Sequence, residues 1–169
     1  METLESLKWL KGHNLFDLTS RIALSLKKVF TPCLAVKDEK VLIIGDKGYE
    51  NRNAAAVLSG AYYLAAEQLN LDAKLILQGV KSRGDISDDD VIQGLSDLKT
   101  GNIIILNMSD KLGNIQDLGK SFRRWVKKKN HRFVSAMSLG DLATSNIDLI
   151  LKAIDVNYKP FQTQHEEIR

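Results

Sequence analysis

The sequence predicts an α/β domain built on an open, mostly parallel sheet with helices on both faces. First, segments with strand character alternate along the chain with segments of helical periodicity. Second, the strand segments are continuous apolar runs between polar turns, which is typical of strands that are buried on both faces. Right-handed crossovers between such strands give a flavodoxin-like or Rossmann-like three-layer sandwich.

Four segments carry the strand signal. The first is "VLII" at 41–44, which lies between the charged turn "KDEK" and Gly45. The others are "AKLILQG" at 73–79, "NIIILNMS" at 102–109 and "RFVSAM" at 132–137. Each is followed by a loop that contains polar and charged residues.

Apolar residues at helical spacing predict helices over 4–10, 17–30, 51–69, 87–98, 117–129 and 145–154. The S-x-x-D patterns Ser87–Asp90 and Ser145–Asp148 predict capping boxes for two of them. Beyond these, "VNYKPF" is expected to be extended and the polar end of the chain helical.

Composition favours a single domain over residues 1–169. The formal net charge of +3 is small for a dedicated nucleic-acid binder. The lone Cys33 cannot form an internal disulfide, and we expect it to be buried among its apolar neighbours. The beginning of the chain has no signal-like apolar region, and no apolar run is long enough to span a bilayer, so we expect a soluble, cytoplasmic protein.

Ligands of open parallel sheets bind beyond the carboxyl ends of the strands, where this chain places polar residues of both signs. Asp46 is interpreted as a turn residue. The loops after the strands also contain Glu50, Asn51, Arg52, Lys81, Arg83, Lys111 and Gly140. The candidate ligand rim comprises Asp46, Lys47, Asn107, Ser109, Asp110, Ser138 and Asp141.

Motifs for specific chemistry are missing from the sequence. No dinucleotide fingerprint, Walker pattern, nucleophile elbow or metal-ligand spacing is present. His131 and His165 are expected to be exposed. The residues therefore predict no catalytic group and no metal ligand.

The basic stretch at 120–132 is a second candidate. Leu118, Phe122, Trp125 and Val126 share one face of the predicted helix, which we expect to pack on the sheet. The aromatic side chains are then unavailable for stacking on bases, so a nucleic-acid partner is disfavoured. We interpret the opposite face as solvated, and an anion-binding patch is the alternative. Its cations are Lys120, Arg123, Arg124, Lys127 and Lys128.

Four stretches together resemble a known enzyme family over about residues 20–169. They are "VLIIGDKG", "NIIILNMSDKLG", "SFRRWVKKKNHRFVSAMSLGDL" and "IDVNYKPF". In their order and spacing they resemble the N-terminal half of the aminopeptidase T type of thermophilic leucyl aminopeptidase, a family of dimetal exopeptidases.

This resemblance implies a non-metal-binding N-terminal domain that lacks catalysis by itself. Family members are about twice this length, and their C-terminal half holds two divalent metals, zinc or cobalt. The implied partners are a C-terminal catalytic domain and a second copy in a homodimer. No catalytic residue carries over to this chain. The alternatives are a stand-alone domain that binds an anionic ligand or nucleic acid, and a domain that only mediates oligomer contacts.

Overall fold

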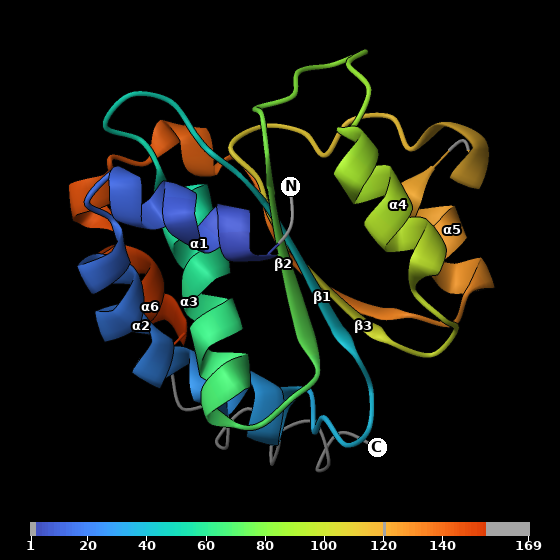
Figure 1. Cartoon of the computed structure of the whole chain (residues 1–169), viewed down its shortest axis with the longest axis horizontal. Coiled ribbons are helices and arrows are strands. Elements are labelled where there is room, and N and C mark those ends of the chain that lie inside the picture. The colour runs from blue at the N-terminus through green and yellow to red at the C-terminus, as the bar shows by residue number, and fades with distance from the viewer. Residues whose placement is uncertain (1–2, 120, 155–169) are drawn as a thin grey trace, which may run out of the picture.

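A computed structural model describes residues 3–119 and 121–154 of the chain (Figure 1). Its centre is a four-stranded sheet in the order β2-β1-β3-β4, and every pair of neighbouring strands is parallel. The strands are β1 (Val41–Asp46), β2 (Ala73–Gln78), β3 (Ile103–Asn107) and β4 (Arg132–Ala136). The predicted α/β fold class is confirmed.

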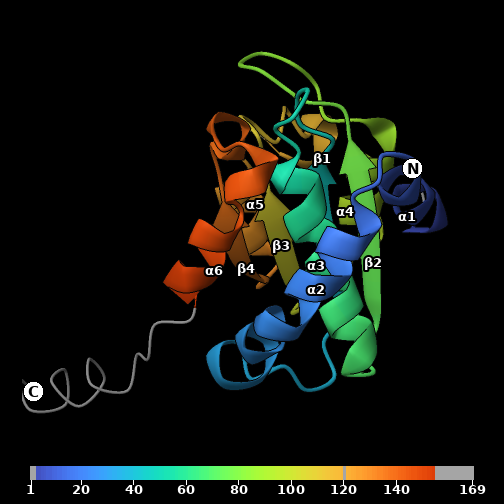
Figure 2. The ribbon, with the colours of Figure 1, turned by 90° about the vertical axis from the view of Figure 1, so that its left-hand side faces the viewer.

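Helices cover both faces of the sheet (Figures 1 and 2). One face carries α2 (Phe16–Lys28) and α3 (Ala54–Gln68), with α1 (Thr3–Gly12) and α6 (Asp148–Ile154) packed beside them. The other face carries α4 (Asp89–Asp97) and α5 (Phe122–Lys128). From β1 the chain passes through α3 to β2 at one edge of the sheet. It then returns through α4 to β3, which lies on the other side of β1. Right-handed crossovers in opposite directions place those two helices on opposite faces.

Helix α3 is rich in alanine because it lies between α2 and the sheet. Almost all of its residues are buried. A Cβ atom on Gly60 would lie 2.5 Å from Leu10 Cδ1 and 2.8 Å from Thr19 Cγ2. Small side chains therefore allow the first two helices to pack closely on α3.

The outer edge of β2 is covered by α1. The Leu75 N–H donates to Thr3 Oγ1 at 3.0 Å, and the Leu77 N–H donates to Ser6 Oγ at 3.1 Å. These hydroxyls satisfy backbone groups that a further strand would otherwise use.

The two predicted capping boxes are wrong. Ser87 is buried and donates its hydroxyl to the Leu112 carbonyl, and α4 begins at Asp89 instead. Residues Thr144–Asn146 form a 3-10 turn, and α6 begins only at Asp148. Serine hydroxyls bond to whichever backbone group lies in reach, and for Ser87 that group belongs to a distant loop.

The predicted helix over 117–129 is divided. A 3-10 turn covers Gln116–Leu118, and Gly119 then adopts φ 155° and ψ 160°, a backbone conformation that is almost confined to glycine. Helix α5 follows with Trp125 and Val126 buried, as predicted. The cations Arg123, Arg124, Lys127 and Lys128 are exposed, also as predicted. Lys120 lies outside the described residues.

Two predictions of burial are wrong. Cys33 is exposed, because α2 continues into a π-helical turn, Val29–Cys33, that buries Val29 and Phe30 and leaves Cys33 at its outer end. His131 is only 7% exposed. It lies in the short turn between α5 and β4, and its ring lies 5.1 Å from that of Trp125.

The stretch "VNYKPF" and the residues after it, including His165, lie outside the described part of the chain. Within the described part, no helix is both long enough and apolar enough to cross a membrane.

His131 is expected to make the fold sensitive to acid. Burial lowers the pKa of its imidazole below 6.5, with a smaller contribution from the charge of Lys129. Its Nδ1 accepts the Asn102 N–H at 3.1 Å, and a protonated Nδ1 cannot do so. Just below pH 6.5 the imidazole therefore binds more protons in the unfolded chain than in the folded chain. The free energy of unfolding should fall as the pH drops below that value.

Urea unfolding between pH 6.5 and about pH 5 measures this slope. The His131→Asn variant keeps an acceptor for the Asn102 N–H but cannot titrate, so its slope should be flatter. His13→Asn, at an exposed position, is the matched control. An equal slope in wild type and His131→Asn would contradict the prediction.

Candidate functional site

The strand order reverses between β1 and β3, and this is where open α/β sheets bind ligands. The loops that follow the strands lie at the top of Figure 1. A pocket of about 330 Å³ opens among the loops after β1, β3 and β4. Its lining residues are Tyr49, Arg52, Ser109, Asp110, Ser138, Gly140 and Asp141.

Asp46, the last residue of β1, connects β1 to the loop after β3. Its side chain is fully buried. Its Oδ2 accepts the Ser109 N–H at 2.6 Å, and its Oδ1 accepts the Ser109 hydroxyl at 2.5 Å. Oδ1 also accepts the Gly48 N–H at 3.0 Å, which forms the turn predicted from the sequence. Burial raises the pKa of Asp46, and the hydrogen bonds from Ser109 and Gly48 oppose that shift.

The loop after β1 presents Tyr49 and Arg52 to the pocket. Their backbones pair in both directions, with N···O distances of 3.2 and 3.0 Å. The Asn53 amide donates to the carbonyls of Lys47 and Tyr49 and closes the loop from the other side. The Arg52 guanidinium carbon lies 5.2 Å from the centre of the Tyr49 ring. The cation is therefore positioned by its own loop.

The loop after β4 is fastened to the loop after β3. A 3-10 turn, Leu139–Asp141, follows Ser138, whose backbone is in the left-handed region with φ 62°. The Leu139 N–H donates to the Met108 carbonyl and the Gly140 N–H to the Ser109 carbonyl, both at 3.0 Å. A Cβ atom on Gly140 would lie 2.8 Å from Tyr49 Cε2 and 2.9 Å from Ser109 O. Only glycine fits where these three loops meet.

The pocket offers charges of both signs. Ser109 donates its only hydroxyl proton to Asp46, so its Oγ can act toward a ligand only as an acceptor. Asp110 and Asp141 add carboxylate acceptors, and Arg52 is the one cation among the described residues that line the pocket. This arrangement can bind a small polar molecule that carries an anionic group and hydrogen-bond donors.

The structure separates the seven predicted rim residues into two groups. Ser109, Asp110, Ser138 and Asp141 line the pocket. The other three do not. Asp46 is buried behind it, Asn107 is buried and donates to Ser59 Oγ, and the Lys47 ammonium lies 6.0 Å from the Trp9 ring.

The predicted rim omitted three lining residues, Tyr49, Arg52 and Gly140. All three lie in loops that directly follow β1 or β4, and this position is the signal by which the sequence could have indicated them. Whether these residues face the pocket depends on the Tyr49–Arg52 turn and on the contact between the loops after β3 and β4. No local sequence pattern specifies either of these.

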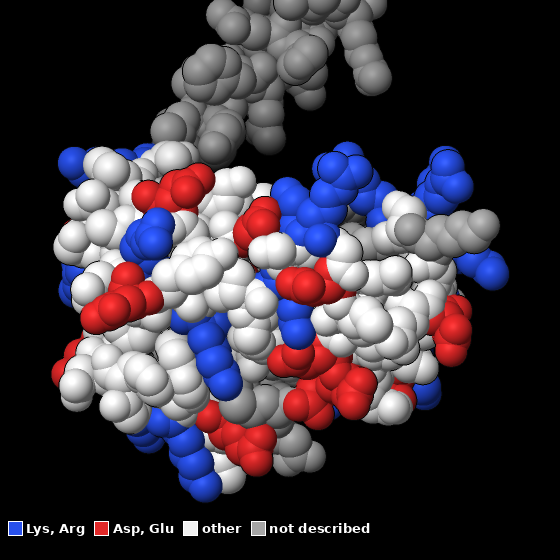
Figure 3. Space-filling view, turned by 90° about the horizontal axis from the view of Figure 1, so that it is seen from above, with Lys and Arg blue, Asp and Glu red and all other residues white. Residues whose placement is uncertain are grey.

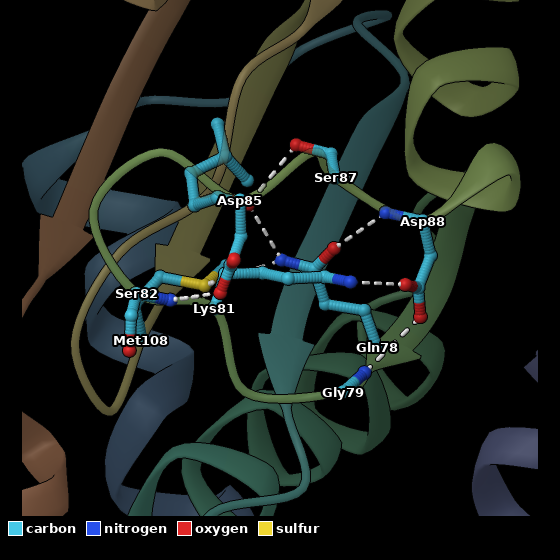
Figure 4. Close-up of polar contacts among 9 residues, drawn as sticks. Gln78, Gly79, Lys81, Ser82, Asp85, Ser87, Asp88 and Met108 are labelled. Carbon is cyan, nitrogen blue, oxygen red and sulfur yellow. Dashed lines mark hydrogen bonds and ion pairs between the residues drawn. The ribbon is translucent and has the colours of Figure 1, made fainter.

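The loop after β2 is held by Gln78, a buried residue at the end of that strand (Figure 4). Its Nε2 donates to the Leu112 carbonyl at 2.8 Å, and its Oε1 accepts the Asp88 N–H at 3.0 Å. The Asp88 carboxylate accepts the Gly79 N–H at 3.1 Å and pairs with the Lys81 ammonium at 2.6 Å. Burial alone would raise the pKa of Asp88, but Lys81 and the Gly79 N–H together lower it.

A second hollow of about 370 Å³ lies between this loop and the loop after β3. Arg83, Asp85, Lys111 and Phe122 contribute to its wall. Figure 3 looks down on this end of the molecule and shows basic and acidic side chains interspersed over it. The cations of α5 do not line the first pocket.

In the described ranges, no group of three or more His, Cys, Asp or Glu side chains is arranged to hold a metal ion. Compared with known proteins, the chain matches no family model, no curated protein and no solved structure.

Asp46→Asn is expected to destabilise the fold by about 1–3 kcal/mol. An amide has one oxygen, so in either orientation its NH₂ group faces the backbone N–H of Gly48 or of Ser109. Chemical denaturation measures the loss. Asp141→Asn, at an exposed position in the same pocket, is the control and should change stability by less than about 0.5 kcal/mol. Equal stabilities of the two variants would show that Asp46 does not hold these loops.

Proposed function

We propose that this domain binds a small polar ligand in the pocket at the carboxyl ends of β1, β3 and β4. The observation that carries the proposal is the convergence of three strand-end loops on one pocket, each fastened to the next by backbone or buried hydrogen bonds. A site built this way is preorganised, so little ordering is needed when a ligand binds.

Arg52 would pair with an anionic group of the ligand, and the carboxylates of Asp110 and Asp141 would accept its N–H or O–H donors. Ser109 Oγ adds one more acceptor. The preferred ligand is therefore an anion that also carries donor groups, such as a small zwitterion.

Thermal unfolding of the full chain with a panel of amino acids, carboxylates and inorganic phosphate tests this proposal. A ligand at about one hundred times its Kd should raise Tm by roughly 5–10 °C in a domain of this size. Arg52→Met should abolish the shift. Arg124→Met, which removes an exposed arginine of α5, should retain it. The absence of any shift, or a shift that persists in Arg52→Met, would contradict the proposal.

The family resemblance supports a second candidate. "VLIIGDKG", "NIIILNMSDKLG" and "HRFVSAMSLGDL" correspond to β1, β3 and β4 with the loops that follow them. These are the strands whose loops line the pocket. In this reading the chain is the non-metal-binding domain of an aminopeptidase T-like metallopeptidase. It would help shape the substrate cavity while a separate domain binds two divalent metals.

The intact mass of the protein from its native cells decides this second candidate. A mass about twice that of the present chain, together with metal-dependent release of N-terminal residues from peptides, would support it. A native mass equal to that of this chain would overturn it and leave the ligand-binding proposal intact.

A further inference from the structure

The outer edge of β4 has no backbone partner among the residues that the structure describes. The Arg132 N–H donates to the Asn102 carbonyl at 3.0 Å, and the Ala136 carbonyl accepts the Met108 N–H at 2.9 Å. Because backbone groups alternate in direction along a strand, those of Phe133 and Ser135 point away from β3. Their N–H groups have no hydrogen-bond partner among the described residues. Ser135 is exposed.

The two edges of the sheet therefore differ. At β2, the hydroxyls of Thr3 and Ser6 occupy the outward N–H groups of Leu75 and Leu77. At β4, no described helix supplies such hydroxyls. An open strand edge is a template for a further strand, and proteins usually close it unless a partner uses it.

The same edge is flanked by the cations of α5. The Phe122 ring packs edge-on against the Phe133 ring, with centroids 5.6 Å apart, so α5 lies over the face of β4 that carries Phe133 and Ser135. Arg123, Arg124, Lys127 and Lys128 are exposed on that helix. They have no carboxylate partner among the residues that the structure describes. In Figure 3, basic side chains gather at the upper right, on the side where Figure 1 shows α5.

Arg132 does not belong to this group of exposed α5 cations. Its guanidinium pairs with Glu39 and donates to the Leu34 carbonyl. Trp125 is buried, so it cannot stack on a base beside the α5 cations.

We propose that the outer edge of β4 docks an extended acidic segment of a partner protein, which adds to the sheet as a fifth strand. The N–H and C=O groups of Phe133 and Ser135 would pair with its backbone. Side chains alternate along a strand, so acidic residues at every second position would face α5. Opposite charge then selects the partner and accelerates its association.

A second copy of the chain fits this edge less well. Two β4 strands paired antiparallel about a twofold axis would bring both α5 helices onto the same face of the joint sheet. Their exposed arginines and lysines would then lie side by side, and like charges repel. An acidic strand meets the same cations favourably.

Binding of a short synthetic peptide to the full chain, followed by fluorescence anisotropy, tests the proposal. The peptide alternates Glu with Val and Thr, so that all its carboxylates lie on one face of a strand. We expect it to bind, with an affinity that falls as salt is added. The same peptide with Lys in place of Glu should not bind. A version with N-methylated backbone amides keeps the charge but loses its donors, and it should bind at least about tenfold more weakly.

Variants of the chain give a second readout. Ser135→Pro removes only an N–H that points outward, and edge strands tolerate such a proline. Peptide binding should therefore be lost, while the unfolding curve of the variant should match that of the wild type. The double variant Lys127→Glu, Lys128→Glu should also lose binding. Lys8→Glu with Lys99→Glu makes the same charge change at exposed positions elsewhere and should bind like wild type. If Ser135→Pro fails to fold, the N-methylated peptide still decides the role of the backbone.

Several results would overturn the proposal. One is failure of the Glu peptide to bind, or equal binding of the Glu and Lys peptides. Another is full binding of the N-methylated peptide, which would mean charge attraction without strand pairing. A dimer in light scattering that Ser135→Pro dissociates would assign the edge to a second copy. The cations would instead be assigned to nucleic acid if single-stranded nucleic acid bound in a way that depends on Lys127 and Lys128 while the Glu peptide did not bind.

Discussion

The arrangement of the loops at the carboxyl ends of the strands depends on the hydrogen bonds of the buried Asp46 carboxylate. Asp46 lies at the end of β1, where the strand order reverses. Its carboxylate accepts both the backbone N–H and the hydroxyl of Ser109. The Ser109 carbonyl in turn accepts the Gly140 N–H, and Gly140 contacts Tyr49. A single buried acid thereby connects the loops of three strands. Without it, the pocket would be lined by three loops with no common anchor.

Asp46 is one case of a pattern shared by three strands. Each of β1, β2 and β3 ends in a buried polar residue, respectively Asp46, Gln78 and Asn107. Each is satisfied by a group from another segment: Ser109, the Leu112 carbonyl and Ser59. Burying such a group unpaired would cost on the order of a few kcal/mol, so the loop or helix that supplies the partner is held in place. Strand β4 ends in Ala136 and has no such terminus, and its outer edge has no backbone partner among the described residues.

The two proposed surfaces both involve β4 but use different chemistry. The pocket uses side chains at the carboxyl end of the strand, where Ser138 begins the last of the three loops. The docking edge uses backbone groups in the middle of the strand together with the basic face of α5. The two proposals therefore place a small ligand and an extended polypeptide at separate sites.

The sequence by itself determined the alternation of strands and helices, the burial of β1 and β3, and the division of α5 into an apolar and a basic face. Those features follow from local periodicity, which is visible in a single chain. Only the tertiary structure decided which loops meet, and hence that Tyr49 and Arg52 join the pocket while Lys47 and Asn107 turn away. It also decided that Ser87 bonds to Leu112 and does not cap α4, that Cys33 is exposed and that His131 is buried. The physical reason is that strand order and hydrogen-bond partners are set by contacts between residues far apart in sequence, and local spacing does not encode those contacts.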